Sequence, residues 1–250
     1  MIYMGTKELK NLYRGSTAMK AVYSGTRKIW PSRKPAAGET VNFADRDWII
    51  CDANYTTNEL FLLMSKASKT KTAWASSNQG TNHWGYSNIL LKTRDTQLSN
   101  ALTTTQKGFL KLHTIQDEYS DMKVKNSNNL NTMISKLLKK TGTSNYSTNY
   151  IFTLSLEEFR DYVNGKTWAV MPATDAVWPQ VWYLHTGFTC YSARDNNREV
   201  YIDGGGTACG GYAYCNVTYG NDRQACIVDW TKTDFDHWAW NDNLGKWILA

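Results

Sequence analysis

The first 30 residues contain a ten-residue repeat that occurs three times and does not recur in the rest of the chain. In the stretch YMGTKELKNLYRGSTAMKAVYSGTRKIW, which starts at Tyr3, each copy has a tyrosine followed two residues later by a glycine. Apolar and polar residues alternate around the Gly-Thr and Gly-Ser pairs, which predicts short β-strands joined by tight turns. Strands this short bury too little surface to be stable alone. The repeat must therefore pack against something else, either copies of itself or a larger assembly.

The positive charge of the chain is concentrated in this repeat. The chain has 28 basic and 22 acidic residues, a formal net charge of +6. Residues 1–34 hold eight of the basic residues and one acid, Glu8, which gives +7, so the other 216 residues carry −1. Because these charges alternate with apolar residues, we interpret them as a solvated strand face or a docking face for an acidic partner, and we expect no nucleic-acid binding. The Pro-, Ala- and Gly-rich segment that follows predicts a linker over residues 35–40.

The sequence has no sign of export or of a membrane span. No apolar run approaches the roughly 18 residues of a membrane-spanning helix, and the N-terminus lacks the hydrophobic region of a signal peptide. We therefore expect a chain without membrane insertion, made in a reducing cytosol, whose five cysteines are free thiols. The alternative is two disulfides among the four late cysteines. The cysteines are Cys51, Cys190, Cys209, Cys215 and Cys226. No Cys or His spacing suggests zinc, so we expect no metal and no cofactor.

After the repeat, the pattern indicates both strands and helices. Residues 41–55 and 59–66 are rich in apolar and β-branched residues and predict strands. A helix is predicted over 87–102, and another over 129–142, where apolar residues follow the i, i+3, i+4, i+7 spacing.

The clearest local signal is the sequence TLSLEEFRDYVNG, residues 153–165. Ser155 and Glu158 have the spacing of a capping box, in which each side chain accepts a hydrogen bond from the other residue's backbone. Gly165 is the expected end of this helix. The segment therefore predicts a short capped helix.

The last third of the chain predicts strands that carry a recognition surface. No lysine occurs between Thr167 and Thr231, and this region is dense in Tyr, Asn, Asp, Arg, Ser and Gly, which dominate evolved binding surfaces. The sequence GGYAYCNVTYGN alternates strictly, which predicts one strand with Tyr212, Tyr214, Asn216 and Thr218 on its outer face. We predict a ligand-binding surface formed by Tyr191, Arg194, Asp195, Asn196, Asn197, Arg198, Tyr212, Tyr214, Asn216, Tyr219, Asn221, Asp222 and Arg223. Trp178 and Trp182 are edge candidates that we assign to core packing.

Four segments in order, YIFTLSLEEF, WYLHTGF, DGGG and RQACIVDW, resemble a bacterial and phage version of the C-type-lectin fold. His185, Thr186 and Gln224 depart from the family pattern, which has Arg, Ser and Pro at these positions. The resemblance implies an α+β class, with a C-type-lectin-like receptor-binding domain over residues 41–250. The decapeptide repeats resemble those that open many tail-fibre and head-fibre proteins of phages, which implies that residues 1–34 are a virion-anchoring module.

The resemblance also implies partners and a location. It implies a virion protein made in the bacterial host cytoplasm, a homo-oligomer with a trimer favoured. Residues 1–34 would contact virion structural proteins, and the larger domain would bind a host cell-surface glycan or protein.

Two other functional classes remain as alternatives. One is a structural virion decoration protein without a ligand. The other is an enzyme, since formylglycine-generating oxidases share a related fold and use two cysteines that have about the separation of Cys209 and Cys215. The strand pattern points Cys215 inward, where a buried apolar role is usual, so we expect no enzyme. The sequence WND at Trp240 is similar to a calcium-site tripeptide of animal lectins, but no partner loop accompanies it, and we predict a turn at Asn241 and Asp242.

Overall fold

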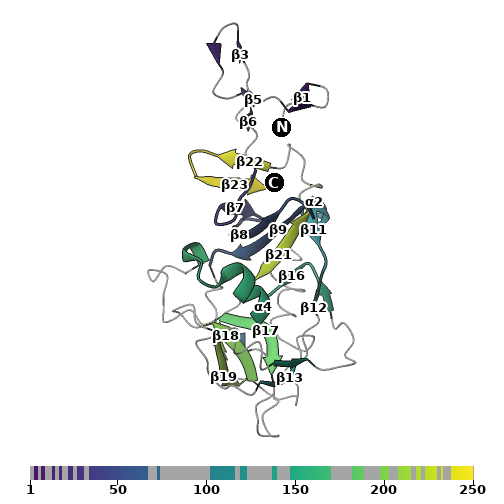
Figure 1. Ribbon diagram of the computed structural model, residues 1–250, viewed down its shortest axis with the longest axis vertical. Helices are drawn as coiled ribbons and strands as arrows, with labels where there is room; N and C mark the ends of the chain where they lie inside the picture. The colour runs from purple at the N-terminus through teal and green to yellow at the C-terminus, as the bar shows by residue number, and fades with distance from the viewer. Residues whose placement is uncertain are drawn as a thin grey trace.

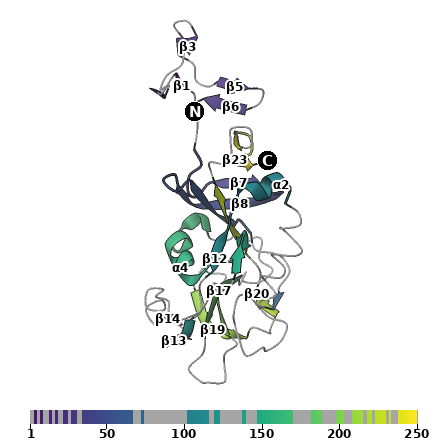
Figure 2. The same ribbon diagram turned by 90° about the vertical axis from the view of Figure 1, so that its right-hand side faces the viewer.

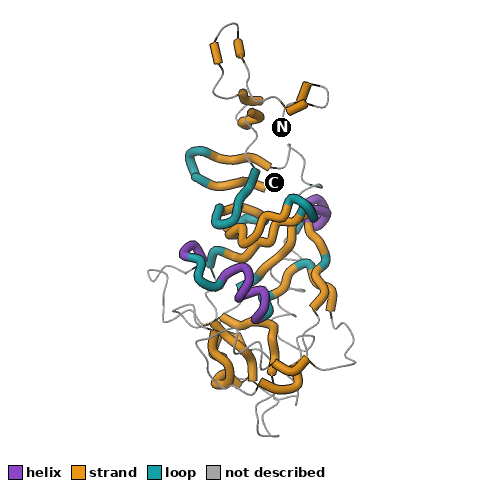
Figure 3. Tube along the Cα trace, in the orientation of Figure 1, coloured by secondary structure: helices purple, strands orange, loops and turns teal. Residues whose placement is uncertain are grey.

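The computed structural model is built mainly from β-strands (Figure 3). It describes residues 3–4, 7–8, 13–14, 17–18, 22–24, 27–30, 34–66, 72–73, 102–115, 119–122, 137–139, 147–169, 182–188, 198–202, 208–214, 218–220, 223–229, 232 and 238–249. The helical segments among them are short: α2 (Thr104–Phe109), α4 (Leu156–Glu158), the π-helical turn η3 (Phe159–Val163) and the 3-10 turn η4 (Thr167–Ala169). The expected α+β class is therefore wrong for the described residues, which form mostly mixed β-sheet.

A mixed sheet at the centre of the molecule holds the core (Figure 1). Among the described residues it has eight strands in the order β11-β21-β9-β8-β7-β23-β22, with β16 also pairing with β21. The strands are β7 (Thr40–Phe43), β8 (Arg46–Asn54), β9 (Glu59–Met64), β11 (Leu110–Lys111), β16 (Ile151–Phe152), β21 (Ala225–Asp229), β22 (Trp238–Asn241) and β23 (Lys246–Leu249). β23 runs parallel to β7, so strands from both ends of residues 40–249 lie side by side.

The predicted strand over residues 41–55 is in fact a hairpin. Ala44 and Asp45 have φ angles of 53° and 58°, and positive φ at both central residues is the mark of a tight type I′ turn. The turn folds β8 back on β7, and β9 and β21 follow as the predicted apolar strands. Side chains from these strands form the core, including Phe43, Trp48 and Leu62, each 0% exposed.

The predicted capped helix is confirmed. Ser155 Oγ accepts from the Glu158 amide at 3.0 Å, and a Glu158 carboxylate oxygen accepts from the Ser155 amide at 2.7 Å. Phe159 and Val163 are buried, while Gly165 has a φ of +74° at the end of the segment. The other Glu158 carboxylate oxygen lies 2.9 Å from His113 Nε2, so one side chain both caps the helix and ties it to the neighbouring strand.

Replacing Ser155 by alanine is expected to lower the free energy of unfolding by about 1 kcal/mol, because the Glu158 amide loses its cap. Urea denaturation measures this change. Thr103→Ala is a matched comparison on the surface of the molecule. Thr103 Oγ1 accepts from the Gln106 amide at 3.1 Å and caps α2 in the same way. Equal stability of Ser155→Ala and the unmodified chain would show that the cap does not stabilise the fold.

The helix predicted over residues 129–142 is wrong where the structure describes it. Leu137–Lys139 form strand β14, which pairs with β13 (Tyr119–Met122). Two adjacent leucines suit a strand as well as a helix, and pairing with a distant segment overrides local propensity. The helix predicted over 87–102 lies outside the described residues except for Leu102, which precedes the α2 cap.

Of the remaining strands, β13, β17, β18 and β19 lie at one end of the molecule, beyond α4, whereas β12 lies beside α4 (Figures 1 and 2). β17, β18 and β19 form a three-stranded antiparallel sheet, and the other strands form pairs among the described residues. The bounds are β10 (Thr72–Ala73), β12 (His113–Ile115), β15 (Ser147–Asn149), β17 (Trp182–Phe188), β18 (Arg198–Ile202), β19 (Ala208–Tyr214) and β20 (Thr218–Gly220). β10 pairs with β20, and β12 with β15.

The three repeats form three hairpins at the opposite end (Figure 1). The hairpins are β1 (Tyr3–Met4) with β2 (Lys7–Glu8), β3 (Tyr13–Arg14) with β4 (Thr17–Ala18), and β5 (Val22–Ser24) with β6 (Arg27–Trp30). In each, two residues connect the strands and glycine is the first of them, which is the sequence rule for a type II′ turn. The predicted short strands are confirmed and pair as one hairpin in each repeat, while the Gly-Thr and Gly-Ser pairs between them lie outside the described residues.

The segment predicted as a linker is docked on the sheet. The Tyr55 hydroxyl donates to the Pro35 carbonyl, and Lys34 Nζ lies 4.8 Å from the centre of the Tyr55 ring. The Gly38 amide donates to the Ile50 carbonyl at 2.7 Å. Gly38 has a φ of +88°, and a Cβ there would lie 3.0 Å from Trp168 Cδ1, so glycine satisfies both the backbone conformation and the close approach of the ring.

Among the described helices, none has the length and apolar character required to cross a bilayer.

Candidate recognition surface

The sheet β17-β18-β19 brings together residues that the sequence predicted separately. Arg198 and Tyr214 are direct partners across β18 and β19, although 15 residues separate them in the sequence. On the other side of β18, Arg198 pairs with Phe188 of β17. The three residues therefore occupy one row across three neighbouring strands, and we call Phe188, Arg198 and Tyr214 the register row.

Phe188 is the member of this row that was not predicted. It ends the segment WYLHTGF, which resembles a family motif and carries no further local signal. Nothing in the local sequence distinguishes Phe188 from a core residue, because its position depends on the pairing between β17 and β18. Trp182, an edge candidate assigned to core packing, pairs with Ile202 at the other end of the same two strands.

The sequence predicted one long strand with a single outer face, but the structure divides this segment between two sheets. β19 ends at Tyr214, and the register with β18 shifts between Glu199 and Val200, opposite the segment that holds Tyr212. Tyr219 belongs to β20, which pairs with β10 and lies in another sheet. The alternation in the sequence therefore does not continue through one strand, because a register shift and a change of partner interrupt it.

Eight of the predicted ligand-binding residues, and the edge candidate Trp178, lie outside the described residues. The eight are Tyr191, Arg194, Asp195, Asn196, Asn197, Asn216, Asn221 and Asp222.

Arg223 lies in the interior, unlike an exposed binding residue. Its side chain is 1% exposed, and its Nε donates to the Met64 carbonyl at 2.9 Å. Burial lowers the pKa of Arg223 to about 10, since the surroundings disfavour its charge. The Met64 amide in turn donates to the Gln224 carbonyl at 2.8 Å, so this corner joins the end of β9 to the start of β21. The apolar segment directly after Arg223, which forms a buried strand, was the sequence signal that Arg223 is buried.

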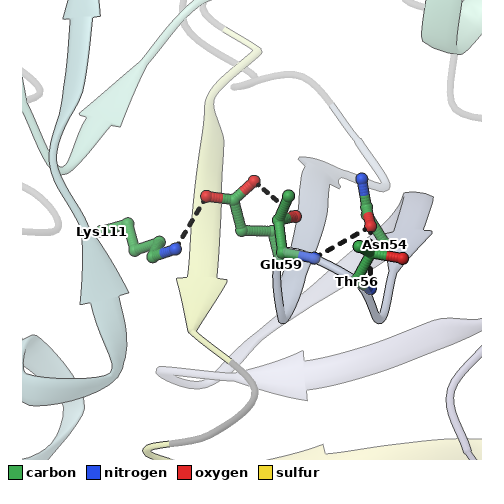
Figure 4. A network of polar contacts seen from close by, with 5 residues as sticks. Asn54, Thr56, Glu59 and Lys111 are labelled. Atoms are coloured by element: carbon green, nitrogen blue, oxygen red, sulfur yellow. Dashed lines mark hydrogen bonds and ion pairs between the residues drawn. The ribbon is translucent and has the colours of Figure 1, made fainter.

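Other polar clusters in the described residues serve to hold strands together. Glu59 accepts from Lys111 Nζ at 2.8 Å and from the Thr57 hydroxyl at 2.9 Å, next to a turn in which Asn54 Oδ1 accepts from the Thr56 amide (Figure 4). The hydrogen bond from Lys111 is the main reason that the pKa of Glu59 lies below its usual value. The ion pair spans from β9 to β11 across β21, and its groups are partly exposed. Such a pair contributes modestly to stability.

Cys51 and Cys226 have the features of structural cysteines, which are buried and unreactive. Cys51 and Cys226 are free and buried, as predicted for these two. Burial raises the pKa of Cys51 to about 12 and raises that of Cys226 as well, so both thiols stay protonated at neutral pH. Cys209 lies in β19 opposite Tyr201, and Cys215 lies outside the described residues together with Cys190.

The predicted turn at Asn241 and Asp242 is confirmed. Asn241 Oδ1 accepts from the amides of Asn243 and Leu244 at 3.1 and 3.0 Å, and Asp242 accepts from Trp240 Nε1 at 2.9 Å. These oxygens are therefore used to form the hairpin between β22 and β23. Within the described residues, no group of three or more His, Cys, Asp or Glu side chains is arranged to hold a metal ion.

No family model matches this chain, and comparison with curated proteins and with solved structures found no match.

Proposed function

We propose that the protein is a phage-type adhesin, attached to a virion through residues 1–34 and binding a host cell-surface glycan or protein through the end formed by β17, β18 and β19. The assembled form would be a homo-oligomer, with a trimer favoured.

One observation carries the proposal: the repeat hairpins and the β17-β18-β19 sheet lie at opposite ends of the molecule, with the eight-stranded sheet between them (Figures 1 and 2). An adhesin has to keep its attachment point away from its recognition surface, since both are occupied at once. This separation supports assigning attachment to one end and recognition to the other.

The docked segment that follows the repeats supports the same division. Pro35 is buried and Gly38 is held between the Ile50 carbonyl and the Trp168 ring, so this segment is fixed against the sheet. A segment that is already fixed on the sheet loses no further conformational entropy when the domain binds a receptor.

The charge and the size of the hairpins support an attachment role. Each hairpin has strands of two to four residues and, among the described residues, forms its own two-stranded sheet, and β6 of the third hairpin also lies close to β22. An isolated two-stranded hairpin is marginally stable in water. With a charge of +7 over residues 1–34, an acidic protein surface is the partner that would both complete the fold and neutralise the module.

Attachment to cells tests the recognition half. The fluorescently labelled full-length protein is applied to a panel of bacteria from the environment in which the gene occurs. A triple variant, in which Tyr212, Tyr214 and Arg194 are replaced by alanine, is applied to the same panel. We expect the triple variant to attach at least tenfold more weakly to the strains that the unmodified protein labels, at about 1–2 kcal/mol per lost contact. Its melting temperature should change little, because the proposal places all three residues on the surface, where substitutions cost little stability.

Tyr150→Ala is the matched control, since Tyr150 is 40% exposed and directly precedes β16, a strand of the eight-stranded sheet. It should attach like the unmodified protein. If the triple variant also attaches normally, this end of the molecule is not the recognition surface. If no strain in the panel is labelled, a structural decoration protein becomes the better assignment.

A further inference from the structure

The register row gives the proposed recognition surface a definite chemical character. Its three positions belong to three successive strands, and each is a direct partner of the next. Adjacent strands lie about 4.8 Å apart, so the row extends over about 10 Å. An aromatic residue occupies each end, and an arginine occupies the middle position.

Arginine is suited to an anionic group. Its guanidinium presents parallel N–H donors that match the two oxygens of a carboxylate or phosphate. Aromatic rings pack well against the apolar faces of sugar rings, because they offer a large rigid surface at a small cost in conformational entropy. An arginine between two aromatic positions is therefore suited to binding one sugar unit that carries a negative charge.

Within the described strands, neighbouring charges do not cancel the preference of Arg198 for an anionic group. Glu199 follows Arg198 along β18 but belongs to the next row, where its partners are Gly187 and Ala213. Successive residues of a strand alternate between its two faces, so Arg198 and Glu199 belong to opposite faces. No lysine occurs between residues 167 and 231, so a cationic group in this sheet has to be an arginine or a histidine.

We infer that Phe188, Arg198 and Tyr214 form a subsite for a sugar that carries a carboxylate or a phosphate. This inference rests on the proposed function and narrows it to a class of ligand. Arg198 holds the anionic group, and the aromatic residues on either side hold the ring.

Calorimetric titration of the full-length protein tests the subsite with three probes. Trigalacturonate supplies carboxylates, glucose 6-phosphate supplies a phosphate, and maltotriose is a neutral sugar of similar size to the first. We expect at least one charged probe to bind at least tenfold more tightly than maltotriose, with an affinity that falls as salt is added. Which charged probe binds more tightly identifies the anionic group.

Variants at Arg198 test the residue assigned to the anion. Arg198→Ala should weaken binding of the charged probe about 10-fold to 100-fold, as expected for lost charge-assisted hydrogen bonds. The affinity of Arg198→Lys should fall between those of the unmodified protein and of Arg198→Ala, because lysine keeps the charge and loses the paired donors. Arg160→Ala is the matched control, since Arg160 lies on the helix and pairs with Asp161 at 2.6 Å. A thermal melt of each variant checks the fold. If Arg198→Ala is unstable, the affinity of Arg198→Lys for the charged probe decides whether Arg198 binds the anion.

The inference is overturned if maltotriose binds as tightly as both charged probes, if neither charged probe binds, or if Arg198→Ala keeps full affinity. These outcomes are distinct from failure of the proposed function. A protein that still labels bacteria, and loses this labelling in the triple variant, remains an adhesin with a ligand of another class.

Discussion

Replacing Trp48 by alanine is expected to lower the free energy of unfolding by about 3–5 kcal/mol. Trp48 is 0% exposed and sits in β8 between Val41 of β7 and Met64 of β9. Its Nε1 donates to the Phe43 carbonyl at 2.9 Å. The substitution leaves a large cavity in the centre of the sheet and removes the donor to a backbone carbonyl. Urea denaturation followed by circular dichroism measures the change.

Two further variants separate the contributions at Trp48. Trp48→Phe keeps most of the ring volume and loses the hydrogen bond, so its cost should be about 1–3 kcal/mol. Leu244→Ala is the surface control, since Leu244 is 59% exposed, and it should stay within about 0.5 kcal/mol of the unmodified chain. A loss for Trp48→Ala no greater than that for Leu244→Ala would contradict the placement of Trp48 in the core.

Replacing Arg223 by alanine is expected to lower the free energy of unfolding by about 2–4 kcal/mol, through the lost side-chain volume and the lost hydrogen bond. The side chain is among the largest that are fully buried, and the Met64 carbonyl loses the Nε donor that lies 2.9 Å away. This result would distinguish Arg223 from the other predicted binding residues, whose substitution should weaken attachment and leave stability nearly unchanged. Denaturation and cell attachment are measured on the same variant.

Arg160→Ala is the control for Arg223, because it removes an arginine that is partly exposed and paired with the adjacent Asp161. Its effect should be about 0–1 kcal/mol, as for exposed ion pairs in general. If Arg223→Ala is as stable as Arg160→Ala but no longer attaches to cells, Arg223 is a binding residue and its assignment to the interior is wrong.

Local sequence signals were sufficient for several elements. The capping box at Ser155 and Glu158, the turn at Asn241 and the hairpins around the repeat glycines each depend on residues a few positions apart. Their hydrogen bonds form within one short segment, so the residue types alone select the conformation. The apolar strands β9 and β21 were also predicted, because their composition is hard to place anywhere except in a core.

The errors come from features that depend on distant parts of the chain. The segment around Leu137 is a strand because β13 pairs with it, and the register between β18 and β19 shifts opposite the segment that holds Tyr212, which interrupts the predicted alternation. Arg223 looked like a surface residue among polar neighbours, yet it bonds to the Met64 carbonyl, 159 positions away in the sequence. No local pattern records such contacts.

Local residue patterns were enough to predict the short strands of the repeats, their basic charge and the residue types available for recognition. Contacts between separate segments place the Pro- and Ala-rich segment against Trp168, bury Arg223, and align Phe188 with Arg198 and Tyr214 in one row. The difference lies in the range of the interactions. A turn or a cap is closed by neighbours in the chain, whereas the register between strands is chosen by the packing of the whole sheet.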